Sequence, residues 1–379
     1  MKRTLSAAVV TGIVLLLFPG CGKTTPAFVA PDVPTPTPAV TMTGPQKTET
    51  AQAQKTAAAI GQTATAVVQT ATAVVREAEA ASARHTATAV ASIPYSEMAE
   101  VPGGTFTQID LSLPGDVLTH AVSSFKIGKY EVTYELWHAV KEWAVKSGYS
   151  FPCALHREGN KGQRNAAPSD AKHHPVTNIS WYDAVVWCNA YSEVSGLAPV
   201  YFSDPEHTVA VRFSVCFLWA GEKIAVYPDW ASAGYRLPTE GEWEYASRYK
   251  DGLSMAPGNY ASGAEGPYTD CEASGAVAWF SYNSGGTTAG AGAAGRTANG
   301  LGIYNMSGNV FEWCWDIHGQ YPSQAVDYRG PGNLTGYGRV VRGGWYGGAD
   351  KQLQTGYRPD SGIHPNFISD STGFRVAKY

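Results

Sequence analysis

The most reactive side chains of this sequence are its six cysteines, which could form disulfides, bind a soft metal or act as nucleophiles. No two of them have the spacing of a Cys-x-x-Cys zinc or redox motif. If the first, Cys21, is set aside, five remain, and an odd number leaves at least one thiol unpaired within the chain. The sequence leaves open how these five pair: Cys153, Cys188, Cys216, Cys271 and Cys314.

Other catalytic constellations are not evident in the sequence. His173 and His174 precede Pro175, with no carboxylate at metal-ligand spacing. Serine, histidine and aspartate are too easily assembled in a chain of 379 residues to indicate a triad. The formal charge of −4 and pI of about 6.1 lack the basic footprint of a nucleic-acid-binding protein, so we expect no nucleic-acid partner.

The N-terminus has the pattern of an export signal. Lys2 and Arg3 precede an apolar run over 7–18, which is too short to span a membrane. Cys21 then stands where a lipoprotein signal peptide has its acylated cysteine, although Pro19 departs from the usual small-residue pattern. We predict a signal peptide over 1–20, lipidation at Cys21 and attachment to the bacterial cell envelope, on its outer surface. The alternative is an ordinary signal peptide in which Cys21 is incidental.

Residues 21–95 carry no apolar core. The stretch 26–45 is rich in Pro and Thr, which favours an extended spacer. A Thr-Ala-Thr-Ala-Val-Val sequence at 63–68 recurs at 70–75, an offset that could support a helix or a short coiled coil. Because Thr and Val weaken helix propensity, we favour a low-complexity stalk that holds the following domain away from a membrane.

The remaining residues, 96–379, predict one globular domain of the α+β class. Helices are expected over 134–146, 180–191 and 239–248, the last two opening with capping boxes. The stretch 252–298 is rich in Gly and Ala and is expected to be mostly loop. Short strands are expected at 101–106, 125–128, 130–132, 310–315, 339–345 and 373–378.

Five ordered motifs give the domain a family resemblance. They are Asn-Ile-Ser-Trp-Tyr-Asp-Ala at 178–184, Tyr-Arg-Leu-Pro-Thr-Glu-Gly-Glu-Trp-Glu-Tyr-Ala at 235–246, Tyr-Asn-Met-Ser-Gly-Asn-Val-Phe-Glu-Trp at 304–313, Arg-Gly-Gly at 342–344 and Gly-Phe-Arg at 373–375. Together they resemble the formylglycine-generating-enzyme (sulfatase-modifying-factor) family across residues 96–379. The resemblance implies a variant of the C-type lectin fold, with a few helices, small sheets and much irregular loop.

The resemblance also implies that this chain lacks the catalytic cysteines of the family's enzymes. Enzymes of that family oxidise a sulfatase cysteine with a copper-holding cysteine pair that follows the Arg-Gly-Gly motif. In this chain Gly348 and Leu353 stand roughly at those positions, and no cysteine follows Cys314. Val376 replaces a structural cysteine of some relatives, which would leave Cys188 without that partner. We therefore expect no enzyme activity and no required cofactor.

One ion site of the family could persist. The resemblance places calcium ligands at the side chains of Asn305 and Glu312 and at the backbone carbonyls of Gly308 and Val310. Such an all-oxygen set suits a hard cation. The alternative is a structural clasp in which Asn305 and Glu312 hydrogen-bond to nearby groups.

The C-terminal segment, residues 345–371, mixes aromatic, small and charged residues without helical or strand periodicity. Its composition is typical of an antibody paratope, and the motifs at 342–344 and 373–375 bracket it. It resembles the diversified segment of the variable proteins of diversity-generating retroelements, and the export signal and stalk closely resemble the Treponema surface lipoproteins of that class.

In such systems mutagenesis is adenine-specific, and a template codon AAC can give Tyr, Gly, Asp, Ser, Ile, His or Phe, but not Trp, Gln or Lys. The resemblance therefore implies a set of variable, ligand-binding positions: Tyr346, Gly347, Gly348, Asp350, Tyr357, Asp360, Ser361, Gly362, Ile363, His364, Phe367, Ser369 and Asp370. We expect the side chains of 346–370 to be mostly exposed and to share one face. Tyr346, Tyr357 and Phe367 are the expected anchors, and Tyr346 is also expected to pack into the scaffold.

The sequence thus favours a surface-displayed, non-catalytic binding protein whose ligand, a protein or a glycan, meets the C-terminal segment. The chain is expected to be a monomer held at the membrane by its N-terminal lipid. The alternative is an envelope-anchored pseudo-enzyme or assembly factor of the sulfatase-modifying-factor family with a fixed partner.

Overall fold

The computed structural model describes residues 96–379 except 114, 152–157, 161–162, 165–170, 216–224, 253, 294, 332–337 and 360, together with 52, 55, 70, 73, 74 and 76, which are helical. The chain divides into two compact units, Met1–Arg76 and Glu77–Tyr379. The signal peptide, Cys21, the rest of the stalk, Cys153, Cys216 and Asp360 lie outside the described residues. None of the helices within the described part combines the length and apolarity that a membrane crossing requires.

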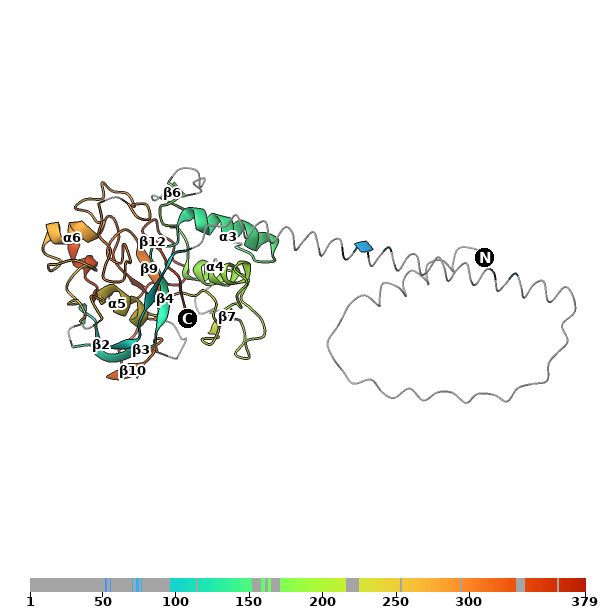
Figure 1. The fold of residues 1–379 in the computed structure, drawn as a ribbon, viewed down its shortest axis with the longest axis horizontal. Helices are drawn as coiled ribbons and strands as arrows, with labels where there is room; N and C mark the ends of the chain where they lie inside the picture. Colours follow the sequence, from blue (N-terminus) through green and yellow to red (C-terminus); the bar gives the residue numbers. More distant parts are fainter. Residues whose placement is uncertain are drawn as a thin grey trace, which may run out of the picture. The chain divides into compact units, whose positions relative to one another are not determined.

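Short strands form the framework of the second unit. Three sheets have three strands each, in the orders β1-β4-β13, β10-β3-β2 and β11-β9-β12 (Figure 1). Two further sheets, β5-β6 and β7-β8, have two strands each. The strand bounds are Met98–Val101 (β1), Gly104–Ile109 (β2), Val117–Val122 (β3), Phe125–Gly128 (β4), Gly159–Asn160 (β5), Gln163–Arg164 (β6), Tyr201–Phe202 (β7), Tyr227–Pro228 (β8), Phe311–Ile317 (β9), Gln324–Val326 (β10), Arg339–Arg342 (β11), Thr372–Gly373 (β12) and Ala377–Lys378 (β13).

Helices begin where the sequence places capping residues. Their bounds are Tyr134–Lys146 (α3), Trp181–Val194 (α4), Glu240–Arg248 (α5) and Cys271–Val277 (α6), with a short 3₁₀ helix at Asp350–Leu353 (η1). Ser180 and Thr239 each complete a capping box, at α4 and α5. The three predicted helices are confirmed, whereas α6 adds a short helix to a stretch that was expected to be mostly loop.

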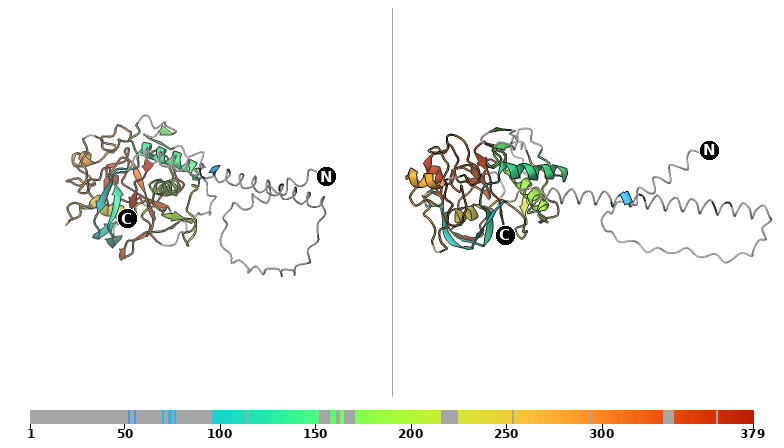
Figure 2. Two further views of the ribbon diagram at one scale, coloured as in Figure 1. Left: turned by 45° about the vertical axis from the view of Figure 1, so that its right-hand side comes forward. Right: turned by 45° about the horizontal axis from the view of Figure 1, so that its top comes forward.

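The main core lies where α3 and α4 pack side by side (Figure 2). The indoles of Trp137 and Trp187 stack with centroids 5.7 Å apart, and Phe374 meets both edge-on. Aromatic pairs in these arrangements stabilise a core beyond the area they bury. Phe374 belongs to the Gly-Phe-Arg motif, so this core fixes the chain just after the C-terminal segment.

The predicted strand at 339–345 ends earlier than the sequence suggests. β11 stops at Arg342 because Gly343 and Gly344 have φ values of +99° and +79°, which only glycine adopts readily. The predicted strand at 373–378 is split into β12 and β13, and the latter pairs with β4 near the start of the domain. Few helices and many short strands confirm the α+β class.

Candidate functional site

Strand β9 holds both ends of the C-terminal segment. On one side β11 runs antiparallel to β9, with Arg342 opposite Glu312. On the other side β12 runs parallel to β9, with Gly373 opposite the same Glu312. The two bracketing motifs therefore pair with opposite edges of a single strand. The segment between them is a long loop whose two ends are held by the same sheet.

Arg342, a buried arginine at the end of β11, holds the middle of the segment in place. Arg342 is fully buried, and its Nη2 lies 2.6 Å from Oε2 of Glu244 on α5. The same guanidinium donates hydrogen bonds to the carbonyl oxygens of Thr355 and Tyr357 at 2.7 and 2.8 Å. Burial raises the pKa of Glu244, while the charges of Arg342 and Arg248 act in the opposite direction. The ion pair thereby ties the middle of the segment to α5.

A second buried arginine comes from the segment itself. Arg358 places its Nε 2.8 Å from Oε1 of Glu240 on α5 and its Nη1 3.3 Å from Oδ2 of Asp110 after β2. Only 1% of Arg358 is exposed. A buried charge without its partners is strongly destabilising. Arg358 is therefore one of the buried residues that hold the segment in place, here called the frame, and not part of its exposed surface.

Between these two arginines and the ends of the segment, backbone hydrogen bonds join it to several separate parts of the domain. They include bonds from Ser281 to Gly348, from Thr355 to Tyr260, between Ile363 and Arg339, and from Trp181 to Pro365. Each part of the segment therefore has its own supporting neighbour, which fixes its path without regular secondary structure.

The two ends of the segment meet through Tyr346 and Asp370. Burial, and then the charge and hydrogen bond of Asp370, raise the pKa of the Tyr346 phenol. Tyr346 is only 7% exposed, its amide donates to the carbonyl of Asn309, and its ring meets Trp345 edge-on at 5.0 Å. The expectation that Tyr346 packs into the scaffold is thus confirmed.

The expectation that residues 346–370 are mostly exposed is wrong. Among the named positions, Gly347, Ser361, His364, Phe367 and Asp370 are exposed; Asp350, Tyr357, Gly362, Ile363 and Ser369 are half-buried; Tyr346 and Gly348 are buried. Leu353, Thr355 and Arg358, within the same stretch, are at most 1% exposed. Leu353, for example, packs with Val277 of α6 and with Phe280, so part of the segment contributes to the interior of the domain.

Ile363 and three glycines are poor positions for free variation. At Gly347 an added Cβ would lie 2.6 Å from the Trp345 indole. Ile363 packs against the main core. Gly362 has a φ of +61°, and an added Cβ would lie 2.6 Å from Cβ of His318. At Gly348 an added Cβ would lie 2.4 Å from Oε1 of Gln352 and 3.0 Å from the Trp345 carbonyl oxygen. Any side chain there requires its neighbours to move.

Comparison with known proteins bears on this arrangement. The model of the sulfatase-modifying factor enzyme 1-like domain matches residues 83–379. The chain belongs to this family. It is 32% identical over 235 residues to the chaperone protein LppX of Paenibacillus barcinonensis, covering 58% of this chain and 70% of that protein. It is also 32% identical over 271 residues to the formylglycine-generating enzyme of Thermomonospora curvata, covering 65% and 81%.

A solved structure, Treponema denticola variable protein 1, has the same fold. It superposes with a TM-score of 0.58 at 28% identity, and the match covers 74% of this chain and 94% of that one. The resemblance predicted from the five motifs, both to the sulfatase-modifying-factor family and to the Treponema variable proteins, is thereby confirmed. So is the predicted C-type lectin fold of the formylglycine-generating-enzyme type.

At the predicted calcium positions, the side chains of Asn305 and Glu312 hydrogen-bond to other side chains of the domain, as in the alternative of a structural clasp. Both carboxylate oxygens of Glu312 lie 2.6 Å from nitrogens of Arg375, and Oε2 also accepts from the Trp243 indole. The amide of Asn305 donates to Glu131 at 3.1 Å. A guanidinium therefore already neutralises Glu312.

Glu131 is the unexpected centre of this clasp. It is buried, and its two carboxylate oxygens accept hydrogen bonds from the amides of Asn305 and Asn309, 174 and 178 residues away. Burial raises its pKa to about 7, opposed by the charge of Arg375 and assisted by that of Glu312. Glu131 lies outside the five motifs, and no local pattern in the sequence indicated its partners.

Two of the three thiols that the structure describes are buried in the domain. Cys188 and Cys314 are free and buried, and burial raises the pKa of each thiol. A thiol without thiolate character is a poor nucleophile or metal ligand. Leu353, at one of the family's catalytic cysteine positions, is buried in a small apolar cluster. Cys271 is a free, half-buried thiol at the start of α6.

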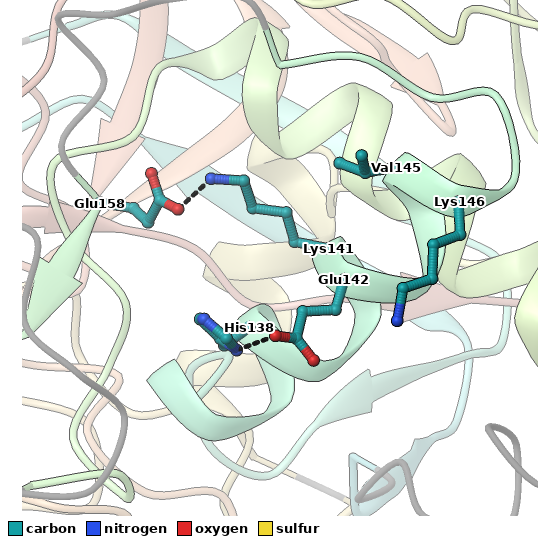
Figure 3. Close-up of a pocket in the computed structure, with 6 residues that line it drawn as sticks. All are labelled: His138, Lys141, Glu142, Val145, Lys146 and Glu158. Carbon is teal, nitrogen blue, oxygen red and sulfur yellow. Dashed lines mark hydrogen bonds and ion pairs between the residues drawn. The ribbon is translucent and has the colours of Figure 1, made fainter.

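A hollow of about 280 Å³ lies along α3, lined by His138, Lys141, Glu142, Val145, Lys146 and Glu158 (Figure 3). Its charges are partly paired within it, since Lys141 contacts Glu158 and Nδ1 of His138 lies 3.8 Å from Glu142. None of its lining residues belongs to the C-terminal segment. We therefore do not place the ligand site there.

Sequence reasoning missed the turn between β2 and β3, which borders the segment. The amide of Leu111 donates to the carbonyl of Gly356 at 3.0 Å. Leu111, Leu113 and Val117 are among the exposed large apolar residues of the domain. The available signal was local: a Leu-Ser-Leu sequence just before Pro-Gly puts apolar side chains where a turn is normally polar.

Proposed function

We propose that this protein is a non-catalytic binding protein whose C-terminal segment forms a diversifiable ligand face. The observation that carries the proposal is the clamping of the segment on both sides of β9 at Glu312, with exposed side chains held between the clamps. Rigid positioning of loop residues is what a binding surface needs, because less ordering entropy is lost when the ligand binds.

The distribution of exposed and buried positions supports this function. Arg358, Leu353 and Thr355 hold the frame, whereas Gly347, Ser361, His364, Phe367 and Asp370 reach solvent. Substitution at exposed positions usually changes stability by no more than about 0.5 kcal/mol, so Ser361, His364, Phe367 and Asp370 could vary without loss of the fold. Of the expected anchors, Phe367 is 48% exposed and Tyr357 half-buried, whereas Tyr346 serves the scaffold.

The proposal includes display at the cell surface. An acylated Cys21 would hold the chain at a membrane, and the stalk 21–95 would give the domain reach. We propose the outer face of the bacterial envelope, where a variable binding face can meet a foreign protein or glycan.

Sequencing the 3′ end of the gene in many sister clones tests the proposed function. We expect a near-copy of this end and a reverse transcriptase gene downstream, and codon changes concentrated at the exposed positions. The codons of Arg342, Leu353, Arg358 and Arg375 should stay constant. A single invariant sequence in all clones, with no near-copy nearby, would contradict the proposal.

A second function, an envelope assembly factor with a fixed partner, is favoured by one observation. The chain is 32% identical to a protein named a chaperone over 70% of that protein's length. Invariance of the C-terminal segment, combined with recovery of one and the same partner by crosslinking in growing cells, would favour this function over a variable face.

A further inference from the structure

The indole of Trp345 lies over the turn that follows it. The Gly348 amide donates to the Trp345 carbonyl at 2.9 Å, which closes a turn over residues 345–348. A Cβ on Gly347 would lie 2.6 Å from both Cη2 and Cζ3 of the indole, and a Cβ on Gly348 would lie 2.9 Å from its Cδ1. The indole therefore occupies the space that side chains at both positions would need.

The two glycines differ in what blocks a side chain. Neither has the positive φ that favours glycine, so the backbone conformation is not the obstacle. At Gly348 the blocking atoms include the Trp345 carbonyl oxygen, 3.0 Å away, which the turn holds in place. At Gly347 the three nearest atoms all belong to the Trp345 indole. A side chain at position 347 can therefore be accommodated by rotation of this one indole, with no movement of the backbone.

Trp345 also lies among exposed positions of the C-terminal segment. It is itself half-buried, and Gly347 and Ala349 are exposed. Its ring meets Tyr346 edge-on with centroids 5.0 Å apart, and the Tyr346 phenol hydrogen-bonds to Asp370, an exposed residue at the other end of the segment. Because Tyr346 is only 7% exposed and fixed in the scaffold, we expect an indole displaced from position 347 to turn toward solvent.

We propose that Trp345 is a contact residue of the ligand face, and that the residue at position 347 determines specificity by setting the orientation of its indole. The proposal rests on the proposed function of the C-terminal segment. Tryptophan is enriched among the few residues that carry most of the binding energy of an interface. A methyl group at position 347 moves a much larger aromatic surface, so a small substitution there changes the shape of the ligand face more than its own size suggests.

Fluorine NMR of the full-length chain, labelled with 5-fluorotryptophan, tests the orientation without a ligand. Trp345→Phe identifies the Trp345 signal among those of the 11 tryptophans, as the one that is lost. We expect Gly347→Ala to shift this signal and to increase its change between H₂O and D₂O, because the indole becomes more exposed. The matched control is Gly290→Ala, whose added Cβ would meet only ordinary contacts, the nearest 3.6 Å away at His174. It should leave the Trp345 signal unchanged.

Binding is tested in a library of the full-length chain that is randomised at 361, 364, 367 and 370 and selected on lysozyme, as a protein probe. We expect Trp345→Ser and Gly347→Ala each to weaken lysozyme binding of the selected clones at least about tenfold, and Gly290→Ala to leave it unchanged. Thermal melts show which variants are folded. Trp345→Leu, which keeps an apolar side chain against Tyr346, replaces Trp345→Ser in any clone that unfolds.

The outcomes separate this proposal from the proposed function. An unshifted Trp345 signal in Gly347→Ala, or folded clones that keep their affinity in that variant, would overturn the role of position 347. Folded clones that keep their affinity without the indole would overturn the contact role of Trp345. Either result leaves the proposed function intact. A folded library without lysozyme binders would overturn the proposed function itself, and the contact role with it.

Discussion

At the scale of single residues, Glu131 makes the sharpest prediction. Its pKa is raised to about 7 in the folded protein, from 4.5, chiefly by burial. The folded state therefore holds the proton more tightly than the unfolded chain does. Its contribution to the free energy of unfolding is largest below pH 4.5, falls as the pH rises to about 7, and then levels off. The two pKa values correspond to about 3 kcal/mol.

Glu131→Gln removes this titration while keeping a carbonyl oxygen for the Asn309 amide. Urea titration measures the free energy of unfolding at pH 5 and at pH 8. We expect this free energy to fall less between the two pH values in the variant than in the unmodified protein. Glu100→Gln, at a carboxylate that is 77% exposed, is the control and should leave the pH dependence unchanged. If the free energy of unfolding fell equally from pH 5 to pH 8 in the unmodified protein and in Glu131→Gln, Glu131 would not titrate in this range.

The clasp at Glu312 makes a second prediction at this scale. Arg375 already neutralises the carboxylate through two contacts of 2.6 Å, so the native state does not need a cation there. We expect the melting temperature to be the same with excess chelator and with added calcium. A rise in melting temperature with calcium concentration would reveal binding to the native state and would favour the calcium alternative.

At the scale of elements, the C-terminal segment combines frame and surface positions within a few residues. Arg358 pairs with Glu240 of α5 and with Asp110, and all three are buried. Arg358→Leu leaves the Asp110 carboxylate without its cation and Glu240 with Arg342 alone, 3.5 Å away, so we expect a loss of about 3–5 kcal/mol in the free energy of unfolding.

Lys351→Ala is the matched substitution on the exposed side of the same segment, and we expect it to cost at most about 0.5 kcal/mol. Urea titrations of both variants measure the difference. Similar values for the two would mean that the ion pairs with α5 do not hold the segment, and the division into frame and surface would fail.

At the scale of the whole molecule, the prediction concerns the anchor. Cys21 follows a charged start and an apolar run too short to span a membrane. We expect the chain to fractionate with membranes and Cys21→Ser to move it to the soluble fraction, as read by detergent phase partitioning. Equal partitioning of the two chains would remove the lipid anchor from the proposed function.

The sequence by itself determined the features that depend on neighbouring residues. Hydroxyls followed three residues later by carboxylates predicted the starts of α4 and α5, and the five ordered motifs predicted the family and fold. The absence of cysteine after Cys314 was equally visible. Caps, turns and motifs are local, because the groups that satisfy them lie within a few residues.

Only the tertiary structure decided which named positions reach solvent and what holds them. Ile363 and Phe367 were both expected among the variable positions, but Ile363 bridges to Arg339 and packs on the core, whereas Phe367 is exposed. Glu131 finds its partners 174 and 178 residues away, and Leu111 meets Gly356 across most of the domain's length. The physical reason is that burial and buried pairing depend on the path of the whole chain, which no local pattern records.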